Sequence, residues 1–165
     1  MTIHYRTYRT SDQQQVVDLI IGIQSEEFGV AITVEDQPDL SDIPDFYQQG
    51  NGHFWVAIYE DRVVGTIALL DIGKQQLALR KMFVAAAFRG SASGVAQSLL
   101  KRSHQWAIEQ GVTDIYLGTI DVYQAAMRFY EKNGYNKIKK SNLPQSFPLI
   151  AVDNVFYRKH LQYNC

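Results

Sequence analysis

Small residues follow a short apolar run near the middle of the sequence. The apolar run is Met82-Phe83-Val84, and the segment from Phe88 to Gly94 reads FRGSASG. It opens directly onto a stretch with the apolar spacing of a helix, from about Gly94 to Gln110. The first backbone amides of a helix lack an intrahelical partner and carry partial positive charge. Because small side chains let a pyrophosphate approach such amides closely, the segment is a candidate phosphate-binding loop.

Basic side chains near this loop add the charge that a polyphosphate ligand requires. They are Arg80, Lys81, Arg89, Lys101 and Arg102. The loop is not a mononucleotide P-loop, because no Gly-Lys pair is followed by Ser or Thr, and the GxGxxG fingerprint is also absent. Taken alone, the segment also fits an ordinary glycine-rich turn.

Two groups of residues together resemble the signatures of the GNAT N-acetyltransferases. The first is similar to their acetyl-coenzyme A signature and comprises Phe83-Val84, Arg89-Gly90, Gly94-Val95-Ala96 and Leu99-Leu100. The second is the run AMRFYEKNGY from Ala126 to Tyr135, in which a tyrosine precedes a helix end and a Gly-aromatic pair. The order and spacing of the expected strands fit this family from about Ile3 to Leu161.

The resemblance implies acetyl-CoA as the co-substrate and a site that holds it. The strand at Met82 to Val84 would splay from the one at Tyr116 to Thr119, and the pantetheine arm would insert between them. Main-chain groups of Phe83 and Val84 would bind the arm and the acetyl carbonyl. The residues expected to contact the cofactor are Met82, Phe83, Val84, Arg89, Gly90, Ser91, Ala92, Ser93, Gly94, Val95, Ala96, Tyr123 and Ala126.

Tyr130 is the expected catalytic residue. By the resemblance it matches the tyrosine near the thioester sulfur, where a phenol would act as general acid toward the departing coenzyme A thiolate. A core aromatic on the face shared with Ala126 and Phe129 is the alternative. The sequence departs from the family at two places. The loop is two residues longer, with Ser91 where Arg or Gln is usual, and Tyr123 replaces a common asparagine.

The acceptor amine must lose a proton before it attacks, which requires a general base or a water chain. Many members of the resembled family carry a glutamate on the strand before the loop, but the corresponding residue here is Ala78. Glu26, Glu27, Glu35 and Asp71 are the remaining candidates, and each is more simply a surface carboxylate. A water-mediated base stays open.

Charge is unevenly distributed along the chain, although the net charge is only −1. Residues 10–61 hold 11 of the 17 acids and no lysine or arginine, whereas residues 62–165 hold 14 basic residues and 6 acids. The acidic region favours a cationic acceptor, with solvated acidic helices as the alternative. Aromatic residues in this region, among them Phe28, would form an apolar wall for the acceptor or pack between helices.

The expected elements form a single domain over residues 1–165. Strands are expected at 3–10, 54–59, 63–70, 76–84, 114–120, 135–139 and 154–161. Helices are expected after an N-cap at Ser11-Asp12, within 26–49, at 94–110 ending at Gly111, and at 123–133. A strand meander followed by a strand–helix–strand–helix–strand unit predicts an α+β fold: a GNAT-like mixed, strongly twisted β-sheet of about seven strands with helices on both faces.

Composition and terminal sequence exclude several classes of protein. The N-terminus lacks the apolar core of a signal peptide, and no apolar run approaches the ~20 residues of a membrane span, so we expect a cytoplasmic protein. The single cysteine, Cys165, excludes an intrachain disulfide. Four scattered histidines without ligand spacing predict no metal site. Near-zero net charge argues against a nucleic-acid partner.

These features predict an N-acetyltransferase that moves an acetyl group from acetyl-CoA to a primary amine by direct attack in a ternary complex. The acceptor would be a small cationic amine or a protein or peptide amine. The alternative is a non-catalytic acetyl-CoA-binding sensor or protein-interaction module, favoured by the missing strand glutamate and by Tyr123. Transfer of longer acyl groups stays open, and a homodimer is compatible with the resembled family.

Overall fold

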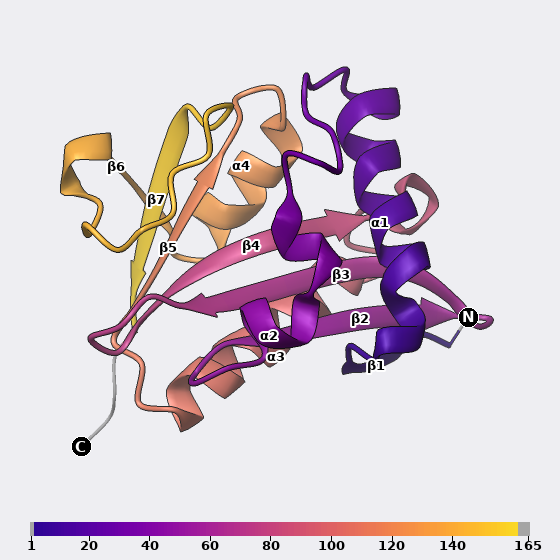
Figure 1. Cartoon of the computed structure of the whole chain (residues 1–165), viewed down its shortest axis with the longest axis horizontal. Helices are drawn as coiled ribbons and strands as arrows, with labels where there is room; N and C mark the ends of the chain where they lie inside the picture. Colours follow the sequence, from indigo (N-terminus) through magenta and orange to yellow (C-terminus); the bar gives the residue numbers. More distant parts are fainter. Residues whose placement is uncertain (1, 162–165) are drawn as a thin grey trace.

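The computed structural model describes residues 2–161, so the expectation about Cys165 lies outside the described residues. Seven strands form one sheet in the order β1-β2-β3-β4-β5-β7-β6, and the sheet twists strongly from β1 to β6 (Figure 1). The strands are β1 (His4–Thr7), β2 (His53–Tyr59), β3 (Arg62–Asp71), β4 (Gln76–Val84), β5 (Asp114–Thr119), β6 (Asn136–Ile138) and β7 (Val155–His160). Among these strands, only β4 and β5 pair in parallel. The predicted mixed sheet is confirmed.

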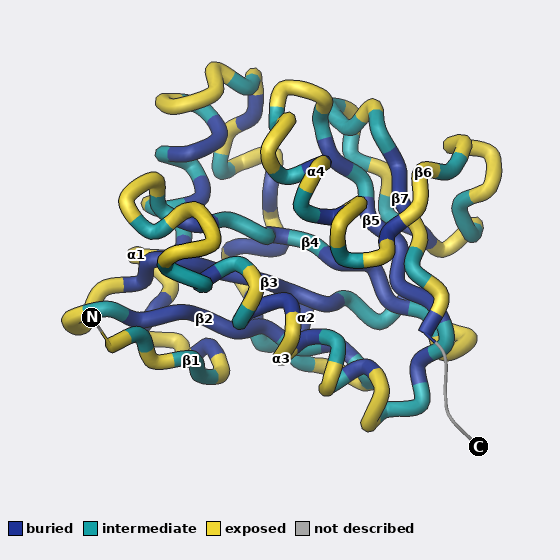
Figure 2. The backbone as a smooth tube through the Cα atoms, turned by 180° about the vertical axis from the view of Figure 1, so that it is seen from behind, coloured by how far each residue is buried: buried dark blue, intermediate teal, exposed yellow. Residues whose placement is uncertain are grey.

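Helices cover both faces of the sheet, as predicted. One face carries α1 (Gln13–Ile21) and α2 (Ile43–Tyr47), and the other carries α3 (Val95–Glu109) and α4 (Gln124–Lys132). Alternate residues of β2 supply the two cores: Phe54 and Val56 pack with α1 and α2, whereas Trp55 and Ala57 pack with α3. Figure 2 shows the buried strands between the partly exposed helices. Within residues 2–161, no helix is long and apolar enough to cross a membrane.

The ends of the helices follow the sequence in one case and depart from it in another. Gly111 ends α3 as expected: its φ is +75°, and its amide donates to Ile108 O at 3.1 Å. Asp12 occupies the predicted N-cap position of α1, but its side chain makes no capping hydrogen bond to that helix. The Asp12 carboxylate instead accepts from Arg9 N at 2.9 Å and from both terminal nitrogens of the Arg6 guanidinium.

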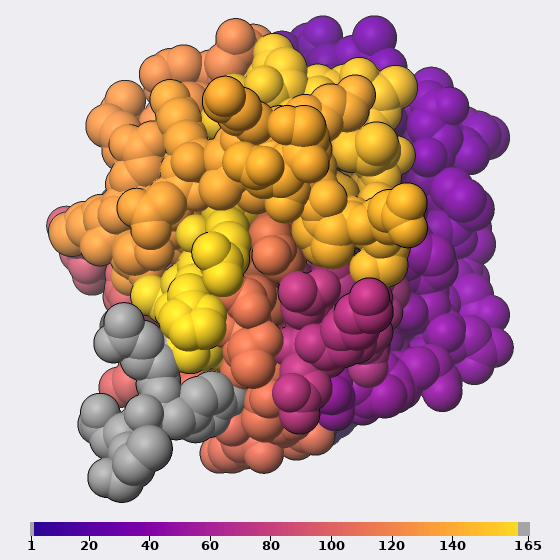
Figure 3. Space-filling view, turned by 90° about the vertical axis from the view of Figure 1, so that its left-hand side faces the viewer, coloured from indigo at the N-terminus to yellow at the C-terminus, as the bar shows by residue number. Residues whose placement is uncertain are grey.

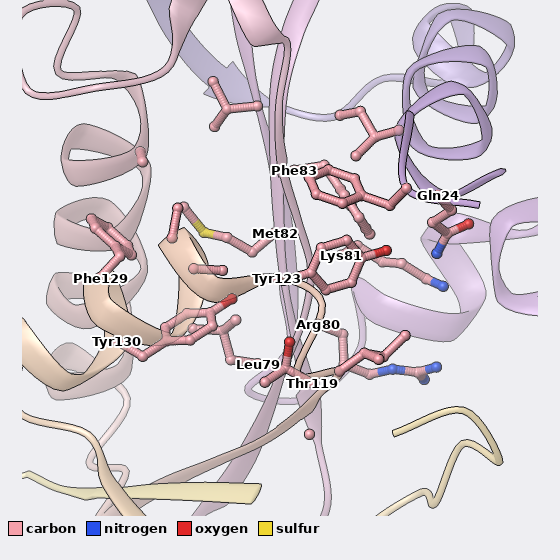
Figure 4. A pocket seen from close by; sticks show the side chains of 18 of the residues that line it. Gln24, Leu79, Arg80, Lys81, Met82, Phe83, Thr119, Tyr123, Phe129 and Tyr130 are labelled. Carbon is pink, nitrogen blue, oxygen red and sulfur yellow. The ribbon is translucent and has the colours of Figure 1, made fainter. Parts of the chain in front are cut away.

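A β-bulge distorts β4 in the middle of the sheet. Thr66 faces Phe83 and Ala68 faces Arg80, so β4 contains one residue more than β3 over this interval. Lys81 has a φ of +53°, and its carbonyl accepts from Thr66 Oγ1 at 2.7 Å. Successive side chains of a regular strand point to opposite faces, but the bulge lets Arg80 and Lys81 both reach the face that carries α2 (Figure 4).

The sheet opens between β4 and β5, as the resemblance implied. Their register covers only three pairs, from Gln76 with Asp114 to Ala78 with Tyr116. Beyond Ala78 the two strands diverge, while β5 stays paired with β7 through Thr119. The divergence leaves one edge of β4 unpaired from Leu79 onward and opens a passage between the two helical faces.

Candidate active site

A cavity of about 880 Å³ occupies the opening between β4 and β5. Residues from both helical faces line it, including the loop before α3, the start of α4 and the π-helical turn Gly22–Glu27 that continues α1. Segment 147–153 completes the lining. Figure 3 shows residues before β7, in orange and yellow, lying against the N-terminal region (residues 10–61), in purple. The cavity is therefore accessible to groups from both faces of the sheet.

Most of the predicted site residues line this cavity. Those that do are Met82, Phe83, Val84, Arg89, Gly90, Ser91, Gly94, Ala96, Tyr123, Ala126 and Tyr130. Ala92, Ser93 and Val95 do not contribute to the lining, and the side chain of Val95 is fully buried in the core beneath α3.

The loop before α3 presents unpaired backbone amides. Among the amides of residues 90–97, only that of Gly94 donates to a described residue, to Gly90 O at 3.4 Å. Gly90 and Gly94 have φ values of +96° and +68°, a region that glycine adopts without strain. The remaining amides gather at the N-terminus of a 15-residue helix, which is a favourable site for a diphosphate.

Tyr130 lies at the base of the cavity, where Figure 4 shows its hydroxyl on the side facing β4. Its ring packs against Tyr135 and Tyr157, with centroids 5.7 and 6.1 Å away. Its hydroxyl makes no hydrogen bond with any other residue in the described part of the chain. Burial raises the pKa of this phenol well above its ordinary value, and the nearby Asp153 raises it further. The group is therefore protonated at neutral pH, as a proton donor must be.

Tyr123 presents a second phenol to the same cavity. Among side-chain polar atoms of residues 2–161 that are completely removed from solvent, its hydroxyl oxygen is the one without a hydrogen-bond partner. The ring is held in place by Phe28 and Phe83, at centroid distances of 4.9 and 6.4 Å. Burial raises the pKa of Tyr123 to about 12. A buried donor without a partner is costly, so this hydroxyl fits a position where a ligand supplies the acceptor.

Asp153 is a residue of the cavity lining that the sequence did not single out. It lines the cavity, and its loop is fixed to β5 because Asn154 N donates to Thr119 O at 2.9 Å. Gly118 on β5 makes room for it, since a Cβ there would lie 2.6 Å from Asp153 Oδ2. Burial raises the pKa of Asp153 to about 6, while Arg80 and Lys81 oppose that rise. The carboxylate is therefore ionised at neutral pH and basic enough to accept a proton.

Lys81 is buried in a polar network beside the cavity. Its Nζ lies 2.5 Å from Gln37 Oε1 and 3.5 Å from Asp39 Oδ2. The Tyr47 hydroxyl donates to the same Asp39 oxygen at 2.5 Å, and the amides of Gln24 and Gln37 bond each other at 2.8 and 3.1 Å. Burial lowers the pKa of Lys81 to about 8. The network attaches the N-terminal region to the bulge of β4.

Comparison with known proteins identifies the family. Residues 18–135 match the family described as Acetyltransferase (GNAT) family. The chain belongs to the GNAT acetyltransferase family. A crystal structure of a GNAT acetyltransferase from Staphylococcus aureus is 38% identical, with a TM-score of 0.95, and covers 98% of this chain and 100% of that one. An acetyltransferase from Streptococcus agalactiae is 30% identical, with a TM-score of 0.92, and covers 96% of this chain and 98% of that one.

A curated relative, N-acetyltransferase 8F1 of Rattus norvegicus, is 33% identical over 122 residues, which are 71% of this chain and 54% of that protein. The chain thus spans about half the length of the curated relatives that it matches. Family membership confirms the predicted class, an acyltransferase with acetyl-CoA as co-substrate. The unpaired loop amides, the open edge of β4 and the unpartnered Tyr123 hydroxyl fit such a ligand.

Arg89, two residues before Ser91 in the lengthened loop, is already engaged within the chain. Its two terminal nitrogens bond the Glu27 carboxylate, and its Nε donates to Val84 O at 2.9 Å. The guanidinium also lies 5.8 Å from the ring of Phe28. In this arrangement Arg89 connects the loop before α3 to the N-terminal region. The carbonyl of Val84, a residue whose main-chain groups were expected to bind the cofactor, already has a donor.

The carboxylates considered as the general base do not line the cavity of this GNAT domain. Glu27 pairs with Arg89, and Asp71 accepts from Asn51 N and Gly73 N at the end of β3. Glu26 and Glu35 are exposed outside the cavity lining. These four predictions receive no support from the structure, and Asp153 takes their place as the acid that lines the cavity.

Replacing Gly94 with alanine tests the phosphate loop. The φ of +68° is strained for alanine by about 1–2 kcal/mol, whereas the new Cβ meets no atom within 4 Å. We expect the distorted loop to raise the Kd for coenzyme A about tenfold and to leave the Kd for pantetheine, which has no diphosphate, unchanged. Isothermal titration calorimetry with the two ligands provides the measurement.

Gly73→Ala is the matched control. Gly73 has a φ of +84° and equally free space for an added Cβ, but lies in the β3–β4 turn outside the cavity lining. It should lose similar stability while keeping the wild-type Kd for coenzyme A. Equal weakening by both substitutions would contradict the assignment of the loop.

Proposed function

We propose that this domain transfers an acetyl group from acetyl-CoA to a primary amine by direct attack in a ternary complex. One observation carries the proposal: a single cavity is lined by the unpaired amides at α3, the Tyr130 hydroxyl and the Asp153 carboxylate. Because the cavity passes through the opening between β4 and β5, cofactor and acceptor can approach the reaction centre from opposite faces of the sheet.

Acetyl-CoA supplies the thioester whose carbonyl carbon is attacked. Asp153 takes a proton from the acceptor ammonium and exposes the nitrogen lone pair for attack. As the new C–N bond forms and the C–S bond breaks, Tyr130 donates its proton to the sulfur and regains one from the nitrogen. The nitrogen thus loses two protons, one ending on the thiol and one passing through Asp153 to solvent.

A non-catalytic acetyl-CoA-binding module is the second candidate. It is favoured by Ala78, which forms the last β4–β5 pair. Many GNAT enzymes carry a glutamate at this position, whereas alanine has no titratable group. A sensor would bind acetyl-CoA without amine-dependent release of free thiol. A broad panel of primary amines, with thiol release as the readout, separates the two functions.

Tyr130→Phe should lower kcat by about 100-fold, because the thiolate would leave without a proton donor. The Kd for coenzyme A should change little, since the ring and its packing are retained. The control is Tyr157→Phe: this ring belongs to the same aromatic cluster, but its hydroxyl donates to Glu131 at 2.6 Å. Wild-type kcat in Tyr130→Phe would exclude the acid role and favour a structural role for the ring.

Asp153→Asn should remove the acid limb of the pH profile. Asp153 has a pKa of about 6 and loses its proton as pH rises through that value. Wild-type kcat/KM should therefore increase around pH 6 and reach a plateau once Asp153 is fully ionised. The amide cannot accept a proton, and we expect a loss of about 100-fold above pH 7.

Asp121→Asn makes the same change of charge at an exposed residue near the end of β5, outside the cavity lining, and should keep the wild-type profile. An acid limb that persists in Asp153→Asn would assign the base to another group.

A further inference from the structure

Arg80 is a cation in the cavity whose hydrogen-bonding capacity is unused. It is half-buried, lines the cavity and lies over the rings of Phe46 and Tyr47, 5.6 and 5.8 Å from their centroids. Within residues 2–161 its side chain donates no hydrogen bond and forms no ion pair. Stacking on aromatic faces fixes a guanidinium while leaving its N–H groups directed elsewhere. Arg80 is therefore positioned to bind an anion.

The neighbouring Lys81 shows the opposite situation. Its ammonium is buried against Gln37 and paired with Asp39, so its charge is neutralised inside the protein. Both side chains leave the bulge of β4 toward the α2 face, as Figure 4 shows, but only Arg80 keeps a charge without a partner. On this side of the opening, the unmatched charge in the cavity is positive.

The charge of the cavity lining differs from that of the N-terminal region. Asp153 is the only carboxylate among the described lining residues, whereas Arg80, Lys81, Arg89 and Lys132 all contribute to the lining. Lys81 and Arg89 are paired with acids of the N-terminal region, and those acids do not line the cavity. The basis for expecting a purely cationic acceptor is therefore absent at the site itself.

Arg80 and Asp153 line the same cavity, and no ion pair joins them within the described residues. Among nearby charges, the Arg80 guanidinium most strongly opposes the rise in the Asp153 pKa that burial causes. A small molecule with an ammonium and a carboxylate would satisfy both groups, with its amine at Asp153 and its carboxylate on the guanidinium fork.

Large apolar side chains line the same cavity as these two charges. They include Ile23, Ile32, Phe83, Phe147, Ile150 and Val152. Such a surface favours an apolar side chain on the acceptor, because transfer from water to this surface is favourable.

We propose that the acceptor is an amino acid with a large apolar side chain, held by an ion pair between its carboxylate and Arg80. The inference rests on the proposed acetyl transfer and narrows its acceptor. Leucine, phenylalanine and tryptophan are suitable probes, and each has a counterpart without the carboxylate: isoamylamine, phenethylamine and tryptamine. Thiol release from acetyl-CoA should show a kcat/KM at least about tenfold higher for the amino acid of each pair.

Arg80→Gln should abolish that difference. The assay is run at least about two pH units above the pKa of Asp153, so that this carboxylate stays ionised without the Arg80 charge. There we expect KM for the amino acids to rise on the order of ten- to hundredfold with kcat nearly unchanged, while KM for the three amines stays at the wild-type value. Arg80→Lys keeps the charge but not the planar fork, so its KM for the amino acids should lie between the wild-type and Arg80→Gln values. Arg62→Gln removes an exposed arginine outside the cavity lining and serves as the control for charge. Circular dichroism and coenzyme A binding establish that each variant is folded.

The possible failures are distinct. Thiol release that favours the amines, or an Arg80→Gln effect equal for amines and amino acids, would overturn the carboxylate site while leaving acetyl transfer intact. Glycine tests the preference for an apolar side chain. If glycine and phenylalanine had the same KM and the same loss in Arg80→Gln, that preference would be overturned. No release from any amine, despite coenzyme A binding, would overturn the proposed transfer and this inference together.

Discussion

The end of the β4–β5 pairing at Ala78 determines where this domain can hold a ligand. A parallel pair inside a sheet normally continues along both strands, and its loss leaves backbone donors and acceptors without partners. Here the bulge at Lys81 turns β4 away, and the Thr66 hydroxyl satisfies the displaced carbonyl. The strand edge that remains free borders the cavity, so the same distortion that weakens the sheet provides main-chain groups for a bound molecule.

The distortion is held in place by charges that are removed from water. Burying the ammonium of Lys81 is costly unless it is paired and hydrogen-bonded, and Asp39 and Gln37 supply both requirements. Asp39 is in turn fixed by the Tyr47 hydroxyl from α2. Removing one member would leave another buried without its partner, which is costly. This cost explains why α2 and the segment that contains Gln37 and Asp39 stay attached to β4 at the opening of the sheet.

Much of the fold could be predicted because its signals are local. The run of mainly apolar and β-branched residues at 63–70 and the glycine after Gln110 are signals that depend on neighbours in sequence, and β3 and α3 appear where expected. The irregular loop before α3 was also predictable, since its small residues and the helix after it are contiguous. Asp153 was not, because its role depends on Gly118 of another strand and on burial by distant segments. The sequence likewise contains no signal that Arg89 pairs with Glu27, 62 residues away.

Two acids of the N-terminal region form ion pairs with basic residues of the cavity lining. Glu27 and Asp39 neutralise Arg89 of the phosphate loop and Lys81 of the bulge, and both pairs cross the boundary between this region and the rest of the domain. Acids that were expected to attract a substrate therefore hold a wall of the cavity in position instead. One ion pair ends at the loop before α3, and the other ends at Lys81, next to Arg80. Both parts of the cavity lining are therefore held by acids from residues 22–39. A local rearrangement of residues 22–39 would consequently change both the phosphate loop and the face that the acceptor meets.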